Sequence, residues 1–281
     1  MGLRINTNVP ALVAQRNLST TRKQLDQTLQ RLSSGMRINT AGDDAAGLAI
    51  SESLRAQIRG LGQASRNAQD GISLVQVAEG AMAEASNLLI RMRELAVQAS
   101  SDTVGPNERK FLDLEFQQAI EEIDRIAQST EYNGVALLNG SSPAFEIQIG
   151  TKNNPLIDRI KLFDGGSTDI NVVSLGINLS SLADKTGAQN SLSAIDRALS
   201  TVTAARAEFG AMQNRLQSVI NNIMISRENL SSANSRVRDA DIAEETSELT
   251  KNQILMQSGV SVLSQANASL KSALGLLGGQ S

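Results

Sequence analysis

An apolar repeat of seven residues dominates the C-terminal part of the chain. It is formed by Ile242, Leu249, Met256, Leu263, Leu270 and Leu277. Apolar residues at this spacing form one stripe along an α-helix that supercoils with a partner helix. A stripe left in water would forfeit about 1.5 to 3 kcal/mol for each large side chain. The repeat therefore predicts a helix whose role depends on what covers its apolar stripe.

The composition of the 281 residues excludes the side chains on which many enzyme active sites depend. There is no Cys and no His, which excludes thiolate nucleophiles, imidazole bases and the common zinc sites. The net charge of −3 is spread over interspersed acids and bases, so no basic patch is offered to nucleic acid or to an anionic membrane. No run reaches the ~20 apolar residues of a membrane span. We expect no enzyme, no cofactor, no metal site, no nucleic acid and no membrane partner.

Two acidic groups could still suggest chemistry. Asp239 and Asp241 could form a metal-binding pair, but they lie at a break between apolar repeats, which favours a helix cap. Glu121, Glu122 and Asp124 could act as paired carboxylates. Neighbouring helix positions point in different directions, however, so a solvated helix face is the favoured interpretation.

The middle of the chain predicts long helices packed through small side chains. One apolar row repeats at seven and a second, mostly small, row follows three residues later: Leu61, Ala68, Val75, Met82, Leu89 and Ala96, then Ala64, Gly71, Ala78, Ala85, Met92 and Ala99. These rows predict one helix of ~50 residues, or ~80 Å. Residues 112–126 predict a third helix that folds back antiparallel, and a row from Ile195 to Val237 predicts a partner for the long helix.

A different pattern between residues 135 and 178 predicts strands. Asn133-Gly134 and Asn139-Gly140 are turn signals, and apolar residues alternate at 145–149, 160–162 and 170–172. The predicted fold class is therefore mainly α. It is a long antiparallel helical bundle or coiled coil, with a small β-hairpin region at the tip and a terminal two-helix coiled-coil foot.

Two breaks in the apolar phase predict the domain boundaries. Leu18, Leu25 and Leu32 form a short N-terminal repeat that is out of phase with Leu61, and the C-terminal repeat changes phase across residues 238–241. Because the two breaks face one another, we expect one boundary. Residues 1–43 form an N-terminal foot helix and connector, residues 44–237 a central helical rod, and residues 238–281 a C-terminal connector and foot helix. We call the two terminal segments the foot.

The foot should be marginally stable by itself. Two helices paired only with each other bury one narrow seam and leave Leu12, Val13, Val260 and Val262 uncovered. We expect the foot to be disordered in the monomer and to fold on assembly, where neighbouring copies cover these positions.

Several stretches of the sequence resemble bacterial flagellin. On the N-terminal side they are RINTN (4–8), LSSG (32–35), RIN (37–39), DDAAGLAI (43–50) and RELAVQ (93–98). On the C-terminal side they are EEIDRI (121–126), YNG (132–134), RDAD (238–241), LTKNQIL (249–255) and QAN (265–267). Only residues 165–188 separate the predicted strands from the following helix, so the chain resembles a short flagellin that lacks the outer variable domains.

The resemblance implies a structural subunit that polymerises into the flagellar filament for swimming motility. It also implies an extracellular location, reached through the flagellar type III secretion apparatus without a cleaved signal peptide. The foot would line the filament channel and the central rod would form the outer tube. The implied partners are other flagellin subunits, an export chaperone at the C-terminal helix, the filament cap, the hook–filament junction proteins and the Toll-like flagellin receptor.

The resemblance further assigns innate-receptor recognition to Arg91, Leu95 and Glu115, which match the family's motif. A simpler interpretation is that Arg91 and Glu115 form salt bridges and that Leu95 packs between subunits. A hook–filament junction protein is the alternative function, because it would share similar ends without forming long polymers. A filament-bound enzyme would need a catalytic insertion, for which residues 165–188 offer no motif.

Overall fold

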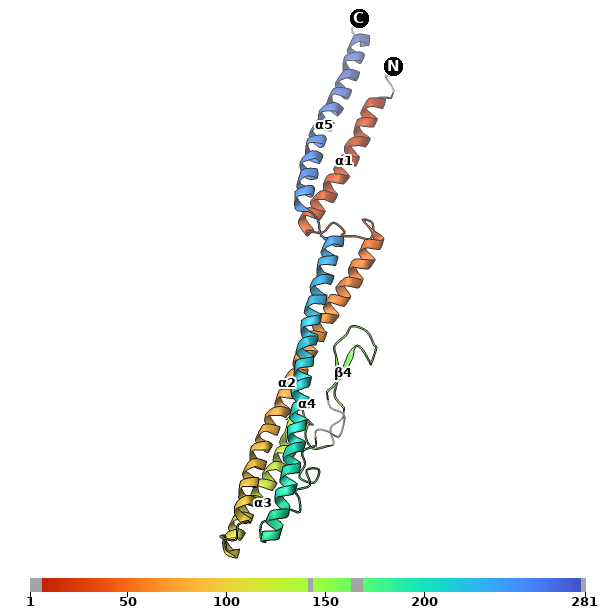
Figure 1. Cartoon of the computed structure of the whole chain (residues 1–281). Coiled ribbons are helices and arrows are strands. Elements are labelled where there is room, and N and C mark those ends of the chain that lie inside the picture. The colour runs from red at the N-terminus through yellow and green to blue at the C-terminus, as the bar shows by residue number, and fades with distance from the viewer. Residues whose placement is uncertain (1–6, 141–143, 163–168, 279–281) are drawn as a thin grey trace. The chain divides into compact units, whose positions relative to one another are not determined.

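The protein is mainly α-helical, as predicted from its apolar repeats. The computed structural model describes residues 7–140, 144–162 and 169–278. The helices in this part of the chain are α1 (Val9–Ser34), α2 (Ala45–Ala99), α3 (Pro106–Ser129), α4 (Lys185–Arg238) and α5 (Ile242–Gly278) (Figure 1). The strands are β1 (Glu131–Tyr132), β2 (Val135–Ala136), β3 (Glu146–Gln148) and β4 (Arg159–Lys161).

The chain divides into two compact units. Met1–Ala56 and Asn229–Ser281 form the terminal unit, and Gln57–Glu228 forms the central unit. The chain passes from one unit to the other within α2 and within α4, so the change of unit needs no separate linker segment.

The two apolar rows predicted on α2 form the core of the central unit. Met82, Leu89 and Met92 are fully buried, as are the small residues Ala78 and Ala85 that alternate with them. Small side chains allow neighbouring helix backbones to approach closely, which explains why so few aromatic residues suffice. The facing row on α4 is buried over the length of this core, at Ile195, Val202, Phe209 and Leu216.

Helix α3 completes the central bundle. It begins at Pro106, which suits the first helical turn because the missing N–H would have had no intrahelical partner. Its apolar face buries Phe116 and Ile123 completely against the core. Asp113 on its other side accepts a hydrogen bond of 2.6 Å from the backbone N–H of Leu182, which fixes the segment that leads into α4.

The β region consists of two short antiparallel hairpins. Asn133 (φ 51°) and Gly134 (φ 76°) form the predicted tight turn between β1 and β2, since a turn of this type needs two positive φ angles. Strand β3 pairs with β4, with Ile147 opposite Ile160. The prediction of a third strand at residues 170–172 was wrong: this segment buries Ile170 in the core but forms no ladder.

The β3–β4 hairpin lies along the first half of α2. The Asn67 side chain donates a 3.0 Å hydrogen bond to the carbonyl oxygen of Gln148. Gly71 leaves room for Ile147, because a Cβ at Gly71 would stand 3.3 Å from the Ile147 side chain. The predicted position at the tip was wrong for this hairpin, since its contacts with Asn67 and Gly71 lie away from the turn that joins α2 to α3.

The connectors between helices fall at the predicted phase breaks. Helix α1 ends at Gly35, whose φ of 68° and bond to the Arg31 carbonyl oxygen form a left-handed C-cap. Asp44 caps α2 by accepting from the Gly47 N–H at 2.9 Å. Asp241 caps α5 by accepting from the Ala243 N–H at 2.8 Å, so the predicted role of its acidic group as a cap is confirmed.

Candidate assembly surface

The foot helices α1 and α5 pair side by side in antiparallel orientation (Figure 1). One polar contact near each end of the pair joins the two helices. The Arg31 guanidinium contacts the Glu245 carboxylate at 3.2 Å near one end. The Asn8 side chain donates to the Ala266 carbonyl oxygen at 3.1 Å near the other end. The pair therefore has one defined register.

The residues of the predicted seam occupy different environments in this pair. Leu25 is buried at 8% exposure, whereas Ile242 is 51% exposed. The remaining seam residues with described side chains are half-buried; they are Leu18, Leu32, Leu249, Met256 and Leu263. The side chains of Leu270 and Leu277 lie outside the described residues. One partner helix thus covers the seam only in part.

A second row on α5, which the apolar repeat did not identify, lies deeper in the contact. It follows the seam by three residues and consists of Glu245, Asn252, Gly259 and Ala266. Asn252 is 1% exposed and Glu245 is 8% exposed. A Cβ at Gly259 would stand 2.8 Å from the Leu18 Cδ1. The three-residue offset seen in the central helices would have found this row, but its polar and small residues gave no apolar signal.

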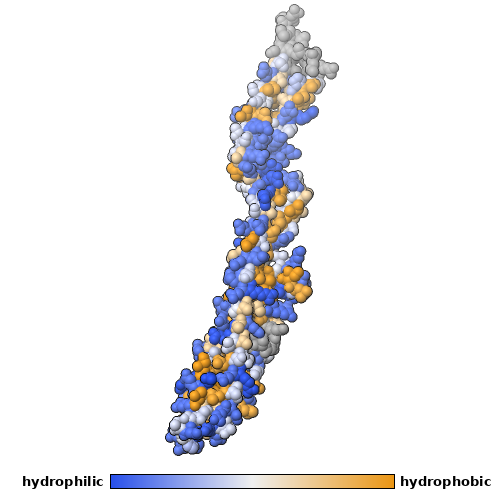
Figure 2. Space-filling model, viewed as in Figure 1, coloured by the Kyte–Doolittle hydropathy of each residue, from blue (hydrophilic) through white to orange (hydrophobic). Residues whose placement is uncertain are grey.

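Apolar side chains remain exposed on the outer faces of both foot helices. On the face drawn in Figure 2, orange hydrophobic residues lie among polar ones in the region of α1 and α5. The exposed apolar residues are Val9, Leu12, Val13 and Leu29 on α1, and Ile242, Ile254, Leu255, Val260 and Val262 on α5, each between 45% and 57% exposed. Such a surface on two thin helices is suited to contacts with further helices.

The central unit carries a second exposed apolar surface. Phe111 and Leu114 on α3 are 71% and 61% exposed, and Ile90 and Val97 on α2 are also exposed. Large apolar residues that the core does not use mark contact surfaces when they occur in groups. This surface lies on the same two helices as the predicted recognition residues.

The predicted recognition residues divide between the surface and the core. Arg91 on α2 donates through Nε and Nη2 to Glu115 Oε1 on α3, at 2.9 and 2.8 Å. The carboxylate of Glu115, followed by that of Glu94, raises the pKa of Arg91. Leu95 is 1% exposed and belongs to the core of its own chain, so the expectation that it packs between subunits was wrong.

The two connectors are joined to each other within the terminal unit. Met36 and Asp239 form an isolated antiparallel bridge, with the Arg37 N–H bonded to the Arg238 carbonyl oxygen at 2.7 Å. Arg238 Nη1 also donates to Glu52 Oε1 at 2.6 Å and to the buried Ser51 hydroxyl at 3.2 Å. These contacts hold the start of α2 and the end of α4 together.

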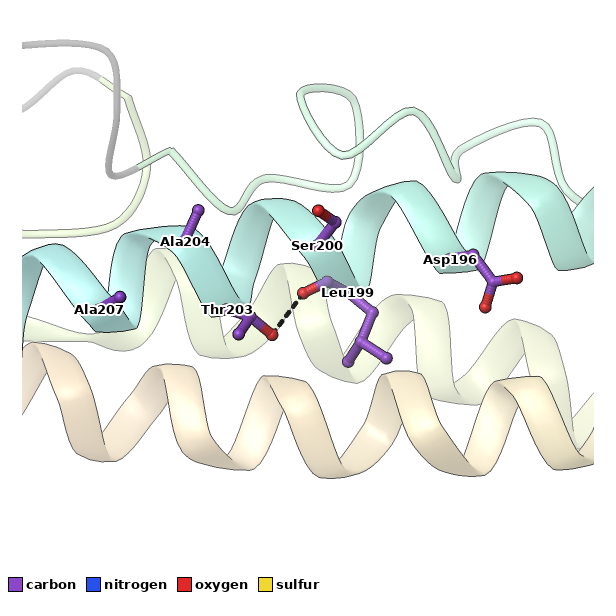
Figure 3. A pocket seen from close by; sticks show the side chains of 6 residues that line it. All are labelled: Asp196, Leu199, Ser200, Thr203, Ala204 and Ala207. Atoms are coloured by element: carbon purple, nitrogen blue, oxygen red, sulfur yellow. Dashed lines mark hydrogen bonds between the residues drawn. The ribbon is translucent and has the colours of Figure 1, made fainter.

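Two other acidic side chains in the described part of the chain form exposed ion pairs. Glu122 pairs with Arg125 at 2.6 Å on an exposed face, as predicted. An open groove on α4 is lined by Asp196, Leu199, Ser200, Thr203, Ala204 and Ala207 (Figure 3). Its one charged group, Asp196, is paired with Arg93 at 2.7 Å. The Thr203 hydroxyl is bonded to the Leu199 carbonyl oxygen.

In residues 7–140, 144–162 and 169–278, no group of three or more His, Cys, Asp or Glu is placed to hold a metal ion. No helix in those ranges combines the length and apolar character needed to cross a membrane.

Comparisons with known proteins point to one family. The bacterial flagellin N-terminal helical region matches residues 5–143, and the bacterial flagellin C-terminal helical region matches residues 192–277. Flagellin of Halalkalibacterium halodurans is 46% identical, over 97% of this chain and 99% of that protein. Flagellin of Bacillus subtilis is 42% identical, over 98% of this chain and 100% of that protein.

Solved structures agree with this assignment. A crystal structure of Bacillus cereus flagellin is 33% identical with a TM-score of 0.50, and covers 56% of this chain and 88% of that one. A flagellar hook-associated protein of Vibrio parahaemolyticus has a TM-score of 0.57, over 70% of this chain and 100% of that one. Its 14% identity extends the likeness to the fold alone. The near-complete matches to proteins named flagellin, at both ends of the chain, show that this chain belongs to the bacterial flagellin family.

Proposed function

We propose that the chain is the structural subunit of a bacterial flagellar filament and serves swimming motility outside the cell. The observation that carries this proposal is the 46% identity to a flagellin over 97% of the chain. The exposed apolar residues on α1 and α5 support it, because a polymer of identical subunits would cover them. Contacts between unlike faces of successive copies generate an open helical tube when they do not close into a ring.

The foot, residues 1–43 and 238–281, forms the inner tube of the filament, and residues 44–237 form the outer tube. In this arrangement the apolar residues of α1 and α5 meet the same residues of neighbouring copies. The exposed Phe111 and Leu114 of α3 meet neighbouring central units. Leu18, Leu25 and Leu32 of α1 pack on α5 in each copy, and the neighbours then cover both helices.

The foot orders only on assembly. Two helices that leave large apolar residues about half exposed gain little from pairing alone, so the cost of ordering them is offset at the growing end. Hydrogen exchange on the dilute monomer should give rapid exchange in α1 and α5 and slow exchange in α2 around Met82. Strong protection of both foot helices in the monomer would contradict coupled folding.

Seeded polymerisation tests the proposed function directly. Purified monomer added to short filament fragments should grow tubes that electron microscopy can measure. Leu263→Asp should leave the central unit folded by circular dichroism and block elongation. A wild-type chain that never elongates on seeds would contradict the filament role, and would favour a hook–filament junction protein.

Export and partner binding follow from the same role. The subunit passes through the flagellar type III secretion apparatus without a cleaved signal peptide. A chaperone binds the C-terminal helix before export, and the cap and the hook–filament junction proteins contact the subunit during growth. The mass of the subunit isolated from filaments tests the absence of cleavage, since a subunit shortened at its N-terminus would contradict it.

The Toll-like flagellin receptor recognises the surface around Arg91 and Glu115, with Leu95 supporting α2 from beneath. The exposed salt bridge presents both charged groups on one face. In a receptor reporter assay, Arg91→Ala monomer should signal more weakly than wild type, while Arg66→Ala, an exposed change elsewhere on α2, should not. Equal signalling by the Arg91 variant and wild type would contradict this assignment.

A further inference from the structure

The apolar seam cannot by itself choose one register for the foot helices. On α5 the seam presents similar large residues every seven positions, at Leu249, Met256 and Leu263, and α1 presents Leu18, Leu25 and Leu32 at the same spacing. Sliding one helix past the other by seven residues therefore presents the same spacing of large apolar residues again. The residues that distinguish the registers must lie elsewhere in the contact.

The second row of α5 contains two contacts that depend on register. Glu245, which is 8% exposed, contacts Arg31 at 3.2 Å, and Arg31 is itself partly covered. Gly259 lies against Leu18, and any Cβ at this position would stand 2.8 Å from the Leu18 Cδ1. The first contact pairs a nearly buried charge with a cation. The second places the end of the Leu18 side chain in the space left by a residue without a Cβ.

A shift of α5 by seven residues in either direction would break both contacts. In one direction Ala266 would face Leu18, and its methyl group would fill the gap that Gly259 leaves. Glu245 would then lie beyond the last turn of α1. In the other direction Asn252 would face Leu18, and the Glu245 carboxylate would lie against the buried Leu25 without a cation. A buried carboxylate without a partner is strongly unfavourable.

Asn252 occupies the row between these two contacts. It is 1% exposed, and neither its amide nitrogen nor its oxygen has a hydrogen-bond partner among the described residues. A buried amide without a partner makes the native pairing less stable. It offers a comparison within the same row, because replacing it should stabilise the pair without changing its register.

We infer that the Gly259 gap for Leu18 and the Glu245–Arg31 ion pair together determine the register in which α5 pairs with α1 of its own chain. They specify this register against pairings shifted by seven residues. Because the foot orders on assembly, this inference rests on the proposed function, and the register is measured in assembled filaments.

Cysteine cross-linking can measure this register, because the chain contains no natural Cys. Thr21→Cys with Met256→Cys reports the native register, since each residue lies three positions from the Leu18–Gly259 contact. Thr21→Cys with Leu249→Cys or Leu263→Cys reports the two shifted registers. Filaments grown from each pair are oxidised, and intramolecular and intermolecular products are separated by denaturing electrophoresis.

The native pair should cross-link within one chain at least about tenfold more than either shifted pair. In a Glu245→Leu, Gly259→Ala background that ratio should fall at least about fivefold, with products of the shifted registers gained. Asn252→Leu and the exposed Gln253→Leu should leave the ratio unchanged. If the double variant does not assemble, Glu245→Gln and Gly259→Ala are tested singly, and each should lower the ratio.

Two results would overturn the inference. One is an unchanged ratio in the Glu245 and Gly259 variants, and the other is equal cross-linking of native and shifted pairs in the parent. Electron microscopy of the same samples separates this outcome from a failure of the proposed function. Filaments with an unselected register contradict only the register determinants, whereas an absence of parent filaments contradicts the filament role.

Discussion

The exposed residue Ile254 offers a direct measure of how much the foot surface contributes to assembly. Its side chain is 57% exposed on α5, so a little over half of its surface is still available for burial by a neighbouring copy. Complete burial of an isoleucine is worth about 1.5 to 3 kcal/mol. Covering the remaining half therefore contributes about 1 to 1.5 kcal/mol to the addition of each subunit.

The substitution Ile254→Ala should raise the critical concentration for elongation by about 5- to 10-fold, because each 1.4 kcal/mol changes an equilibrium constant tenfold. Ile254→Asp would also bury an unpaired carboxylate, which costs several kcal/mol more, so growth should stop at accessible concentrations. The assay is the monomer concentration left at equilibrium with sheared filaments after sedimentation.

The control is Gln257→Ala on the same helix, which removes an exposed polar side chain and should change the critical concentration by less than about twofold. The reasoning fails if Ile254→Ala and Ile254→Asp both assemble at the wild-type critical concentration. Ile254 would then face solvent in the filament, and the apolar residues of α5 would not form the subunit contact.

Three further predictions concern stability. Phe116→Ala should lower the free energy of unfolding of the central unit by about 3 to 5 kcal/mol in urea titrations, whereas Phe111→Ala, at an exposed position, should have little effect. Asp241→Ala should lower the stability of assembled α5 by about 1 kcal/mol, because two backbone N–H groups lose their cap, and the melting temperature of filaments measures this loss. The backbone N–H groups of Thr40 and Asn39 lower the pKa of Asp43, so its stabilising contribution is present above its unfolded pKa and is lost as the pH falls through the lowered value. Asp43→Asn should therefore flatten the acid side of the stability profile; an equally steep profile would contradict this.

The sequence predicted the helical fold well because large apolar residues at regular spacing leave few ways to be buried. Met82, Leu89 and Ile195 are repeat positions, and all are buried where the repeat places them. The end of α1 was also predictable, since Gly35 adopts the positive φ that its residue type favours. The alternation of apolar residues at 170–172 wrongly predicted a strand. Ile170 is buried because it packs in the hydrophobic core, which needs no strand partner.

The contact surfaces were less predictable, because they depend on where helices meet. Leu95 matched a recognition pattern, but in the structure α2 packs so that the Leu95 side chain lies in the hydrophobic core. Glu245 and Asn252 are polar, so their hydropathy predicts exposed side chains. In the structure the α1–α5 contact buries both residues. The role of Gly259 depends on the position of Leu18, which lies far away in the sequence.

The hydrogen-bonded connectors have a mechanical consequence. The segment from α1 to α2 and the segment from α4 to α5 are two covalent paths, and the bonds of Arg37 to Arg238 and of Ala240 to Gly35 tie them together. A torque on either foot helix is thus shared by both paths before it reaches α2 or α4. Arg238 stiffens this joint through Ser51 and Glu52, so the connector transmits twist rather than absorbing it as a free hinge would.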